Sequence, residues 1–181
     1  MNNLKDIVFS TNNQKVLSFL LENPDKKFFD REISKLTGIS RAGTNFALRK
    51  LAEVGLLDVS KKGRMNFYSV KILDVITRYL KIIQNILTLH KLVESLKEET
   101  IKIILYGSAS RGENTSESDV DLFVLTNNKA DAESKIFRHQ LRDKLRSVIK
   151  TPNDFLKIKK ENPIFCDEVE RGIILWQAKQ A

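Results

Sequence analysis

Residues 107 to 122 read GSASRGENTSESDVDL, and this stretch decides the fold of the second half of the chain. An apolar run precedes it at residues 101–106, and another follows it at residues 122–125. This order predicts a strand, a small-residue turn, the start of a short helix, and a second strand that carries Asp119 and Asp121. Because side chains alternate between the two faces of a strand, these two carboxylates point the same way.

Two carboxylates on one face repel each other, and a divalent cation relieves that repulsion. Mg²⁺ prefers one or two carboxylates together with the phosphates of a substrate. Gly107 lets the backbone approach a phosphate closely, Ser108 offers a hydroxyl, and the following helix start offers N–H groups to an anion. The stretch therefore predicts a site for Mg²⁺ (or Mn²⁺) and a nucleoside triphosphate (NTP), with ATP as the expected nucleotide.

The pattern GSxxRG followed by SDxDL resembles the minimal nucleotidyltransferases of the DNA polymerase β superfamily, over roughly residues 96–177. The resemblance implies transfer of a nucleoside monophosphate from an NTP to a hydroxyl, with release of pyrophosphate. Two metal ions about 3.5–4 Å apart would stabilise the attacking and leaving oxygens. The implied catalytic residues and metal ligands are Asp119 and Asp121. The implied nucleotide-binding residues are Gly107, Ser108, Arg111 and Ser118.

Two of these residues have more than one interpretation. Arg111 lies one helical turn after Ser108, where it can neutralise charge on the leaving group or brace Asp119. The alternative for Arg111 is a salt bridge to Glu113 or Glu117. For Ser118, which directly precedes Asp119, the alternative is that it only orients the carboxylates.

One part of the superfamily's pattern is missing. Full enzymes that resemble this chain add a third carboxylate on a later strand, where it binds metal and activates the acceptor hydroxyl. That strand is expected near residues 146–150, which read RSVIK and contain no acid. Neither Asp143 nor Asp154 is well placed to substitute, and the alternative is that Asp154, in the next loop, swings in. Loss of a base typically lowers a rate by about 10²–10⁴-fold, so the sequence predicts weak or partner-dependent transfer.

The first part of the chain predicts three helices and a hairpin. Ser40 can cap the third helix, and Gly55 can end it. The expected helices run over residues 16–21, 31–37 and 40–54, and the expected strands over 57–60 and 66–70.

Residues 31–57, REISKLTGISRAGTNFALRKLAEVGLL, resemble a winged helix-turn-helix domain. The resemblance implies that the third helix enters the major groove of duplex DNA, while the hairpin contacts phosphates. The implied exposed readers are Arg41, Thr44, Asn45 and Arg49, and the implied phosphate contacts are Lys61, Lys62 and Arg64. The alternative is that these cations form only a solvated face.

A long helix is predicted over residues 72–97. Its apolar residues recur at alternating spacings of four and three, the pattern of a coiled coil. The repeating residues are Val75, Tyr79, Ile82, Ile86, Leu89, Val93 and Leu96. We expect a homodimer through this helix, although the helix can instead pack on both domains of its own chain.

The expected fold is α+β: a winged-helix domain at residues 1–70, a connecting and dimerisation helix at 71–97, and a polymerase β-like nucleotidyltransferase domain with a small mixed sheet at 98–181. Later in the chain, helices are expected over residues 130–147, from 151 to a break at 162–163, and over 168–179.

Composition narrows the class of protein. The 181 residues are 41% hydrophobic and 30% charged with a net charge of +8, which is typical of a globular protein with an acidic partner such as nucleic acid. Cys166 is the only cysteine, so no intrachain disulfide can form. No signal peptide or membrane-spanning run is present, so we expect a cytoplasmic location and no membrane partner.

Two hypotheses about function follow. The first is a metal-dependent nucleotidyltransferase that acts on a protein or nucleic-acid acceptor and carries a DNA-binding head, for example an antitoxin that modifies a helical toxin. The alternative is a winged-helix transcription regulator whose nucleotidyltransferase domain is a degenerate nucleotide sensor. A drug-modifying enzyme is disfavoured, because its cationic substrates would suit an acidic cleft.

Overall fold

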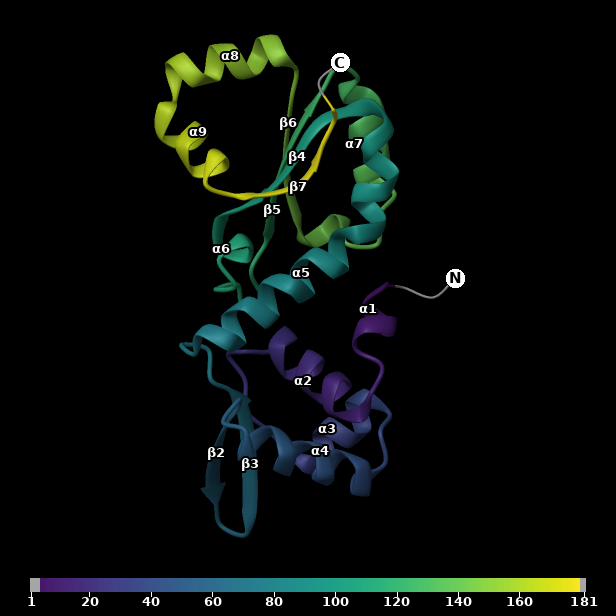
Figure 1. Cartoon of the computed structure of the whole chain (residues 1–181), viewed down its shortest axis with the longest axis vertical. Helices are drawn as coiled ribbons and strands as arrows, with labels where there is room; N and C mark the ends of the chain where they lie inside the picture. The colour runs from purple at the N-terminus through teal and green to yellow at the C-terminus, as the bar shows by residue number, and fades with distance from the viewer. Residues whose placement is uncertain (1–3, 180–181) are drawn as a thin grey trace. The chain divides into compact units, whose positions relative to one another are not determined.

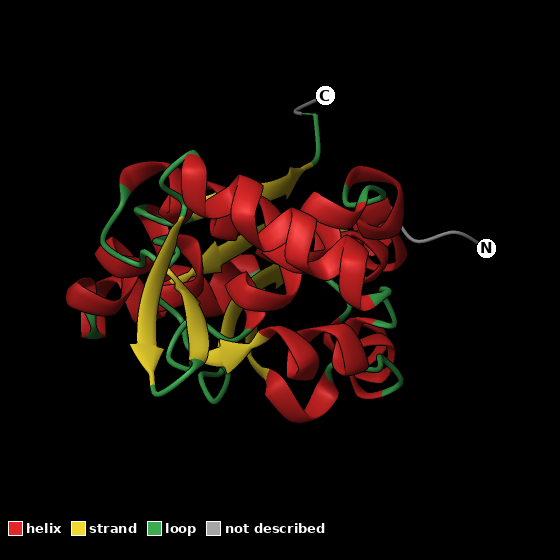
Figure 2. Ribbon diagram, turned by 90° about the horizontal axis from the view of Figure 1, so that it is seen from below, coloured by secondary structure: helices red, strands yellow, loops and turns green. Residues whose placement is uncertain are grey.

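The structure is a computed structural model that describes residues 4–179. The chain divides into two compact units, Met1–Gln84 and Asn85–Ala181, here called the N-terminal and C-terminal units. Both units combine helices with strands (Figures 1 and 2). Among residues 4–179, no helix is both long enough and apolar enough to cross a membrane.

The N-terminal unit combines short helices with a small antiparallel sheet. The helices are α1 (Leu4–Val8), α2 (Asn12–Glu22), α3 (Asp30–Thr37) and α4 (Arg41–Glu53), and the strands are β1 (Phe28–Phe29), β2 (Leu57–Lys62) and β3 (Met65–Val70). The sheet order is β1-β3-β2, and β2 and β3 form a hairpin that pairs Leu57 with Val70 and Lys62 with Met65.

Local signals in the sequence place these elements. The Ser40 hydroxyl accepts a hydrogen bond from the Gly43 N–H at 3.2 Å and so caps α4. Gly38, with φ of 70°, ends α3 in the left-handed conformation. Gly63 supplies the positive φ of the hairpin turn. The helices and the hairpin expected in this part of the sequence are therefore present.

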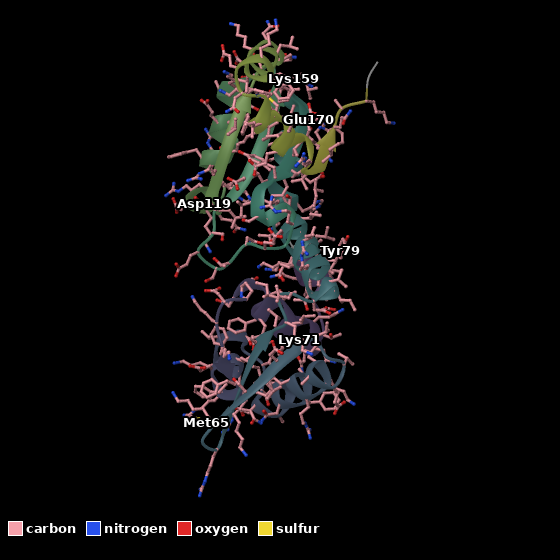
Figure 3. The ribbon with its side chains drawn as sticks, turned by 90° about the vertical axis from the view of Figure 1, so that its left-hand side faces the viewer. Met65, Lys71, Tyr79, Asp119, Lys159 and Glu170 are labelled. Carbon is pink, nitrogen blue, oxygen red and sulfur yellow. The ribbon has the colours of Figure 1, made fainter. Side chains whose placement is uncertain are left out.

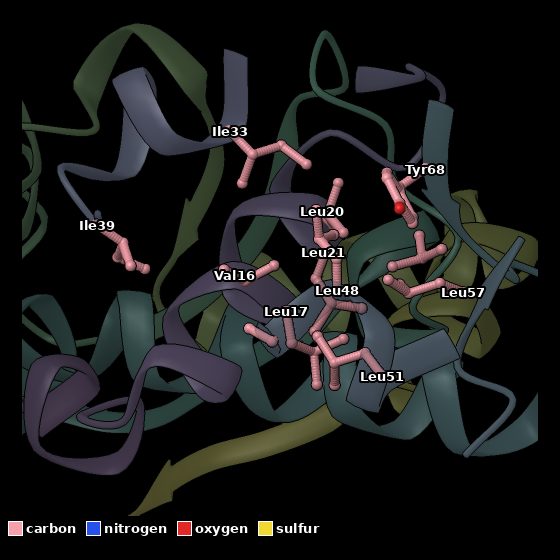
Figure 4. Close-up of a cluster of buried hydrophobic side chains, with 12 residues drawn as sticks. Val16, Leu17, Leu20, Leu21, Ile33, Ile39, Leu48, Leu51, Leu57 and Tyr68 are labelled. Atoms are coloured by element: carbon pink, nitrogen blue, oxygen red, sulfur yellow. The ribbon is translucent and has the colours of Figure 1, made fainter. Parts of the chain in front are cut away.

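One apolar core joins α2, α3 and α4 to the sheet (Figure 4). Leu20 and Leu21 on α2, Ile33 on α3 and Leu48 on α4 are fully buried, and Leu57 begins β2 beside them. Each buried side chain of this size contributes about 1.5–3 kcal/mol relative to an exposed one.

The long helix α5 (Val75–Leu96) contributes to the core of each unit. In the N-terminal unit, Lys81 Nζ donates to the Leu21 carbonyl at 2.6 Å, and Gln84 Nε2 donates to the Ser18 carbonyl at 3.1 Å. The Lys81 bond satisfies a carbonyl group in the last turn of α2, where a helix cannot satisfy its own, and the Gln84 bond adds a contact one turn earlier.

The apolar residues of the α5 repeat lie in different environments. Leu89, Val93 and Leu96 are buried in the core of the C-terminal unit. Val75 and Tyr79 are exposed, and the Tyr79 side chain, labelled in Figure 3, is 64% exposed. Intrachain packing thus accounts for the second half of the repeat, whereas homodimerisation stays a prediction that concerns the first half.

The buried Lys81 side chain should make the free energy of unfolding depend on pH. Burial lowers the pKa of Lys81 from 10.5 to about 8, although the charges of Glu22 and Asp25 raise it. Between these two pH values the unfolded chain binds more protons than the folded chain, so stability should rise with pH. The full rise is about 3 kcal/mol, at 1.36 kcal/mol per pKa unit, and about 2 kcal/mol of it falls between pH 7.5 and pH 9.5. Urea unfolding at about pH 7.5 and about pH 9.5 measures it.

Lys81→Met is the matched variant for this measurement, because it keeps a long side chain and removes the titrating group. The rise in stability should be absent from this variant. An equal rise in Lys81→Met would assign the effect to other groups.

The C-terminal unit contains a mixed sheet of order β6-β5-β4-β7. Its strands are β4 (Thr100–Tyr106), β5 (Val120–Thr126), β6 (Leu145–Lys150) and β7 (Ile173–Gln177), and its helices after α5 are α6 (Gly107–Ser110), α7 (Lys129–Phe137), α8 (Pro152–Glu161) and α9 (Pro163–Glu170). Strand β4 pairs antiparallel with β5 and β7, and β5 pairs parallel with β6. The expected small mixed sheet is confirmed.

Side chains from both faces of this sheet are buried. Ile103 and Leu105 pack with residues of α5 and α7, whereas Ile104 and Tyr106 pack with Val169 of α9 and with neighbouring aromatic rings. In Figure 1, α7 lies on one side of the sheet and α8 and α9 on the other.

Two expected helices are wrong. The helix expected over residues 130–147 ends at Phe137, and residues 145–150 form strand β6. The helix expected over residues 168–179 is replaced by the end of α9 and by β7. In both places a short apolar run satisfied a helical spacing and an alternating one equally well, and pairing with the sheet decided the outcome.

Candidate functional site

The two carboxylates lie where β5 begins, beside the end of β4. The β4–β5 register sets Tyr106 opposite Asp121, so Gly107 follows directly beside that carboxylate. Asp119 lies two residues earlier, and its side chain is 49% exposed (Figure 3). The expected strand, turn and second strand are therefore present, although Asp119 directly precedes β5, which begins at Val120.

Gly107 is required by both its conformation and its surroundings. Its φ of +68° lies in the left-handed region, and a Cβ atom at this position would come within 2.3 Å of Asp121 Oδ2. The turn therefore holds backbone directly against the Asp121 carboxylate. Ser108 follows in α6, and the Ser110 hydroxyl donates to the Gly107 carbonyl at 2.8 Å, which fixes the turn.

Arg146 is a member of the site that sequence reasoning did not identify. The parallel β5–β6 register sets it beside Asp121, and its Nη2 atom lies 3.4 Å from Asp119 Oδ2. Its side chain is 71% exposed. The sequence contained a signal for Arg146. Residues 146–150 were expected to form a later strand of the site, and Arg146 is the first of them.

Electrostatics at the site reflect burial and mixed charges. Burial raises the pKa of Asp121, the negative charges of Glu168 and Asp119 raise it further, and Arg146 opposes them. Burial also raises the pKa of Tyr106 to about 12, with Asp121 and Glu168 adding to the rise. The negative charge of Glu168, on α9, thus acts on both Asp121 and Tyr106. The sequence could not reveal it, because α9 was not expected there.

The loop before the carboxylates is held by its own hydrogen bonds. The Ser118 hydroxyl accepts from the Thr115 N–H at 2.9 Å. Asn114 is buried, and its side-chain oxygen accepts from Asn85 Nδ2 at 2.9 Å. Ser118 therefore has a part in shaping the loop, and its role toward the nucleotide or the carboxylates stays a prediction.

Arg111 points to a neighbouring acid. Its Nε atom lies 2.8 Å from Glu113 Oε2, which is one of the alternatives that the sequence left open. Its positive charge still lowers the pKa of Asp121, although less than other groups affect it.

The other acids considered as a third carboxylate have different positions. Asp154 closes a capping box with Thr151 at the start of α8 and pairs with Lys129 Nζ at 2.6 Å. Hydrogen bonds from Lys129 and Thr151 lower the pKa of Asp154 to about 2. Asp143 is 87% exposed in a 3-10 turn and pairs with Arg142. Both have structural partners of their own.

The donor set at the site suits a metal that arrives with phosphates. Within residues 4–179, no group of three or more His, Cys, Asp or Glu side chains is arranged to hold a metal ion. Mg²⁺ can nevertheless be held by one or two carboxylates when substrate phosphates supply further ligands. Asp119 and Asp121 fit that requirement, since both are oxygen donors close to the glycine turn.

The residues expected to contact DNA do not all share one surface. Arg41, Arg49, Lys61, Lys62 and Arg64 are exposed, and Asn45 is partly exposed. The expectation that Thr44 is exposed is wrong: it is fully buried, and its hydroxyl lies 3.5 Å from the Ile39 carbonyl as a hydrogen-bond donor. Phe46 is 52% exposed on α4.

Asp119 directly before β5, Asp121 within it, a glycine turn against Asp121 and a small mixed sheet form the arrangement that the sequence predicted for a nucleotidyltransferase domain. Residues 88–181 match the family model described as "Polymerase beta, Nucleotidyltransferase", and the chain belongs to that family. Over 95 residues it is also 31% identical to protein adenylyltransferase MntA of Shewanella oneidensis. That match covers 50% of this chain and 66% of the relative.

Proposed function

We propose that the C-terminal unit transfers a nucleoside monophosphate from a metal-bound NTP, with ATP as the nucleotide, to a hydroxyl of a protein or nucleic-acid acceptor. The observation that carries this proposal is the Asp119–Asp121 pair at the start of β5, with the Gly107 backbone against Asp121. Membership of the nucleotidyltransferase family supports it. The test is transfer of label from α-labelled ATP by the wild type and its loss in Asp121→Ala.

Each residue of the proposed site has a defined task. Asp119 and Asp121 would hold Mg²⁺ (or Mn²⁺), which when bound neutralises phosphate charge and polarises the transferred phosphoryl group. Gly107 lets the triphosphate lie close to the backbone, and Ser108 offers it a hydroxyl. Ser118 shapes the loop that orients Asp119, and Arg111 adds positive charge.

A protein is the favoured acceptor class. The relative MntA is described as a protein adenylyltransferase, which supports adenylate transfer to a protein side-chain hydroxyl. A small helical toxin is our concrete candidate for that acceptor. Since residues 145–150 of β6 contain no acid, we propose that the acceptor must contribute through its own positioning, which can be worth about 7–11 kcal/mol of barrier.

We propose further that the N-terminal unit is a winged helix-turn-helix domain that binds duplex DNA. Helices α3 and α4 joined by a left-handed glycine, followed by the β2–β3 hairpin, support this. Arg41, Asn45 and Arg49 would read bases from α4. Lys61, Lys62 and Arg64 would contact phosphates, since all three are exposed around the hairpin turn. Homodimerisation through the exposed first turns of α5 would match two half-sites.

DNA binding of this kind should depend strongly on salt. Replacing Lys61, Lys62 and Arg64 by glutamine should flatten the slope of log K against log salt by up to about 0.9 for each phosphate that the hairpin no longer neutralises. Fluorescence anisotropy with a labelled duplex at several salt concentrations measures the slope. Lys157, exposed on α8 of the C-terminal unit, provides a control substitution that removes charge elsewhere. An unchanged slope in the triple variant would exclude the hairpin as a phosphate-binding element.

The second candidate function is a transcription regulator whose C-terminal unit senses a nucleotide without transferring it. One observation favours it: Arg146, and no acid, occupies the strand beside Asp121. Clear nucleotide binding with no transfer to any acceptor would support this candidate over the first.

A further inference from the structure

We propose that Arg146 is an exchangeable counter-ion of the Asp119–Asp121 pair: the carboxylates hold it before ligand binds, and it moves to the triphosphate when metal-bound nucleotide enters. This rests on the proposed function, because it concerns the same site. Its consequence is that metal and nucleotide should bind together, while the metal alone binds weakly.

The geometry places a cation where the pair needs one. Strand β6 runs parallel to β5 with Arg146 as the register partner of Asp121. The guanidinium reaches Asp119 at 3.4 Å, so one arginine lies beside both carboxylates. The negative charge of Glu168, on α9, also raises the pKa of Asp121.

The interaction is loose enough to be exchanged. Charge-assisted bonds between a guanidinium and a carboxylate are normally about 2.7–2.9 Å long, whereas Arg146 lies 3.4 Å from Asp119. With 71% of its side chain exposed, Arg146 has room to take another rotamer. Exposed pairs of this kind contribute little to stability, so the fold does not depend on this ion pair.

A triphosphate gives the guanidinium a better partner. Arginine presents a planar set of donors that matches phosphate oxygens in pairs. A bare metal ion must compete with Arg146 for Asp119 and leaves the guanidinium without a new anion. A metal ion that arrives with a triphosphate releases the carboxylate and supplies the arginine with an anion at the same time.

The test compares two affinities in the full chain. Binding of Mn²⁺ alone is followed by electron paramagnetic resonance, and binding of Mg²⁺-ATP is followed by calorimetry. In Arg146→Gln, affinity for Mn²⁺ alone should rise and affinity for Mg²⁺-ATP should fall, each by about tenfold, which is within the usual range for coupling between ligands. A purely structural role would weaken both.

Lys150→Gln is the matched control, because it removes one positive charge from the same strand. Lys150 pairs with Leu125 at the other end of β6, about 13 Å from Arg146 at 3.3 Å per residue and beyond the Debye length of about 8 Å at physiological ionic strength. Both affinities should remain at the wild-type values.

The outcomes separate this inference from the proposed function. The proposed exchange of Arg146 requires that Arg146→Gln change the affinities for Mn²⁺ alone and for Mg²⁺-ATP in opposite directions. Any other result overturns it. If Asp119→Asn with Asp121→Asn abolishes both binding events in the same series, the metal site stands even when the exchange fails. If that double variant binds both ligands normally, the proposed metal site is wrong. The proposed movement of Arg146 is then wrong as well.

Discussion

The Asp121→Ala variant is expected to lose all transfer of label from α-labelled ATP while keeping its fold. Asp121 lies opposite Tyr106 and against the Gly107 backbone. Removing it takes away one of the two carboxylates proposed to hold the metal. The measurement is label retained on protein or nucleic acid, with circular dichroism as the check on folding.

Wild-type transfer in this assay is expected to be slow with the chain alone and faster with the right acceptor. Asp154→Ala is the control, because Asp154 completes the capping box of α8 with Thr151 and pairs with Lys129. Loss of a cap costs about 1 kcal/mol of stability, and transfer should fall only modestly. Total loss of transfer in a folded Asp154→Ala protein would show that Asp154 is the third carboxylate after all.

The local parts of the site follow from the sequence alone. Alternation along a strand predicts that Asp119 and Asp121 share one face, and a Gly-Ser pair between two apolar runs predicts the turn beside Asp121. These arguments involve neighbours in the chain, so they need no knowledge of how distant segments pack. For the same reason the Ser40 cap and the Gly38 turn were predictable in the N-terminal unit.

The rest of the site depends on contacts between distant segments. Arg146 reaches Asp119 only because β6 pairs with β5 in one register, and a shift of one residue would turn its side chain to the other face. The influence of Glu168 depends on α9 packing against β4, where the Phe165 ring meets the Tyr106 ring at 5.9 Å. The sequence of residues 163–177 did not predict that arrangement, because its apolar spacing also suits a helix where β7 forms.

Thr44 illustrates a different limit. A polar residue in the first turns of α4 was expected to face solvent, but the packing of α4 turns it inward, where its hydroxyl is satisfied by the Ile39 carbonyl. Polarity is therefore a weak guide to exposure when a hydroxyl can bond to a nearby backbone group. On the same helix, the apolar Phe46 is half-exposed whereas the polar Thr44 is buried.

The Gly107→Ala variant is expected to lose most of its affinity for Mg²⁺-ATP. Its added methyl group would come within 2.3 Å of Asp121 Oδ2, so the turn or the carboxylate must move. The wild-type protein should gain about 2.7 kcal/mol of stability at a hundredfold excess of ligand over Kd, and this gain should largely disappear in the variant. Calorimetric titration and thermal unfolding with and without Mg²⁺-ATP measure both effects.

Gly38→Ala separates the clash with Asp121 from the cost of the backbone conformation. Gly38 has φ of +70°, close to the +68° of Gly107, but a Cβ atom there would have no atom within 4 Å. Each substitution should cost about 1–2 kcal/mol for placing alanine in the left-handed region, yet Gly38→Ala should bind Mg²⁺-ATP like the wild type. If Gly107→Ala also binds like the wild type, the triphosphate does not lie against this turn, and the assignment of Gly107 and Ser108 to the nucleotide site is wrong.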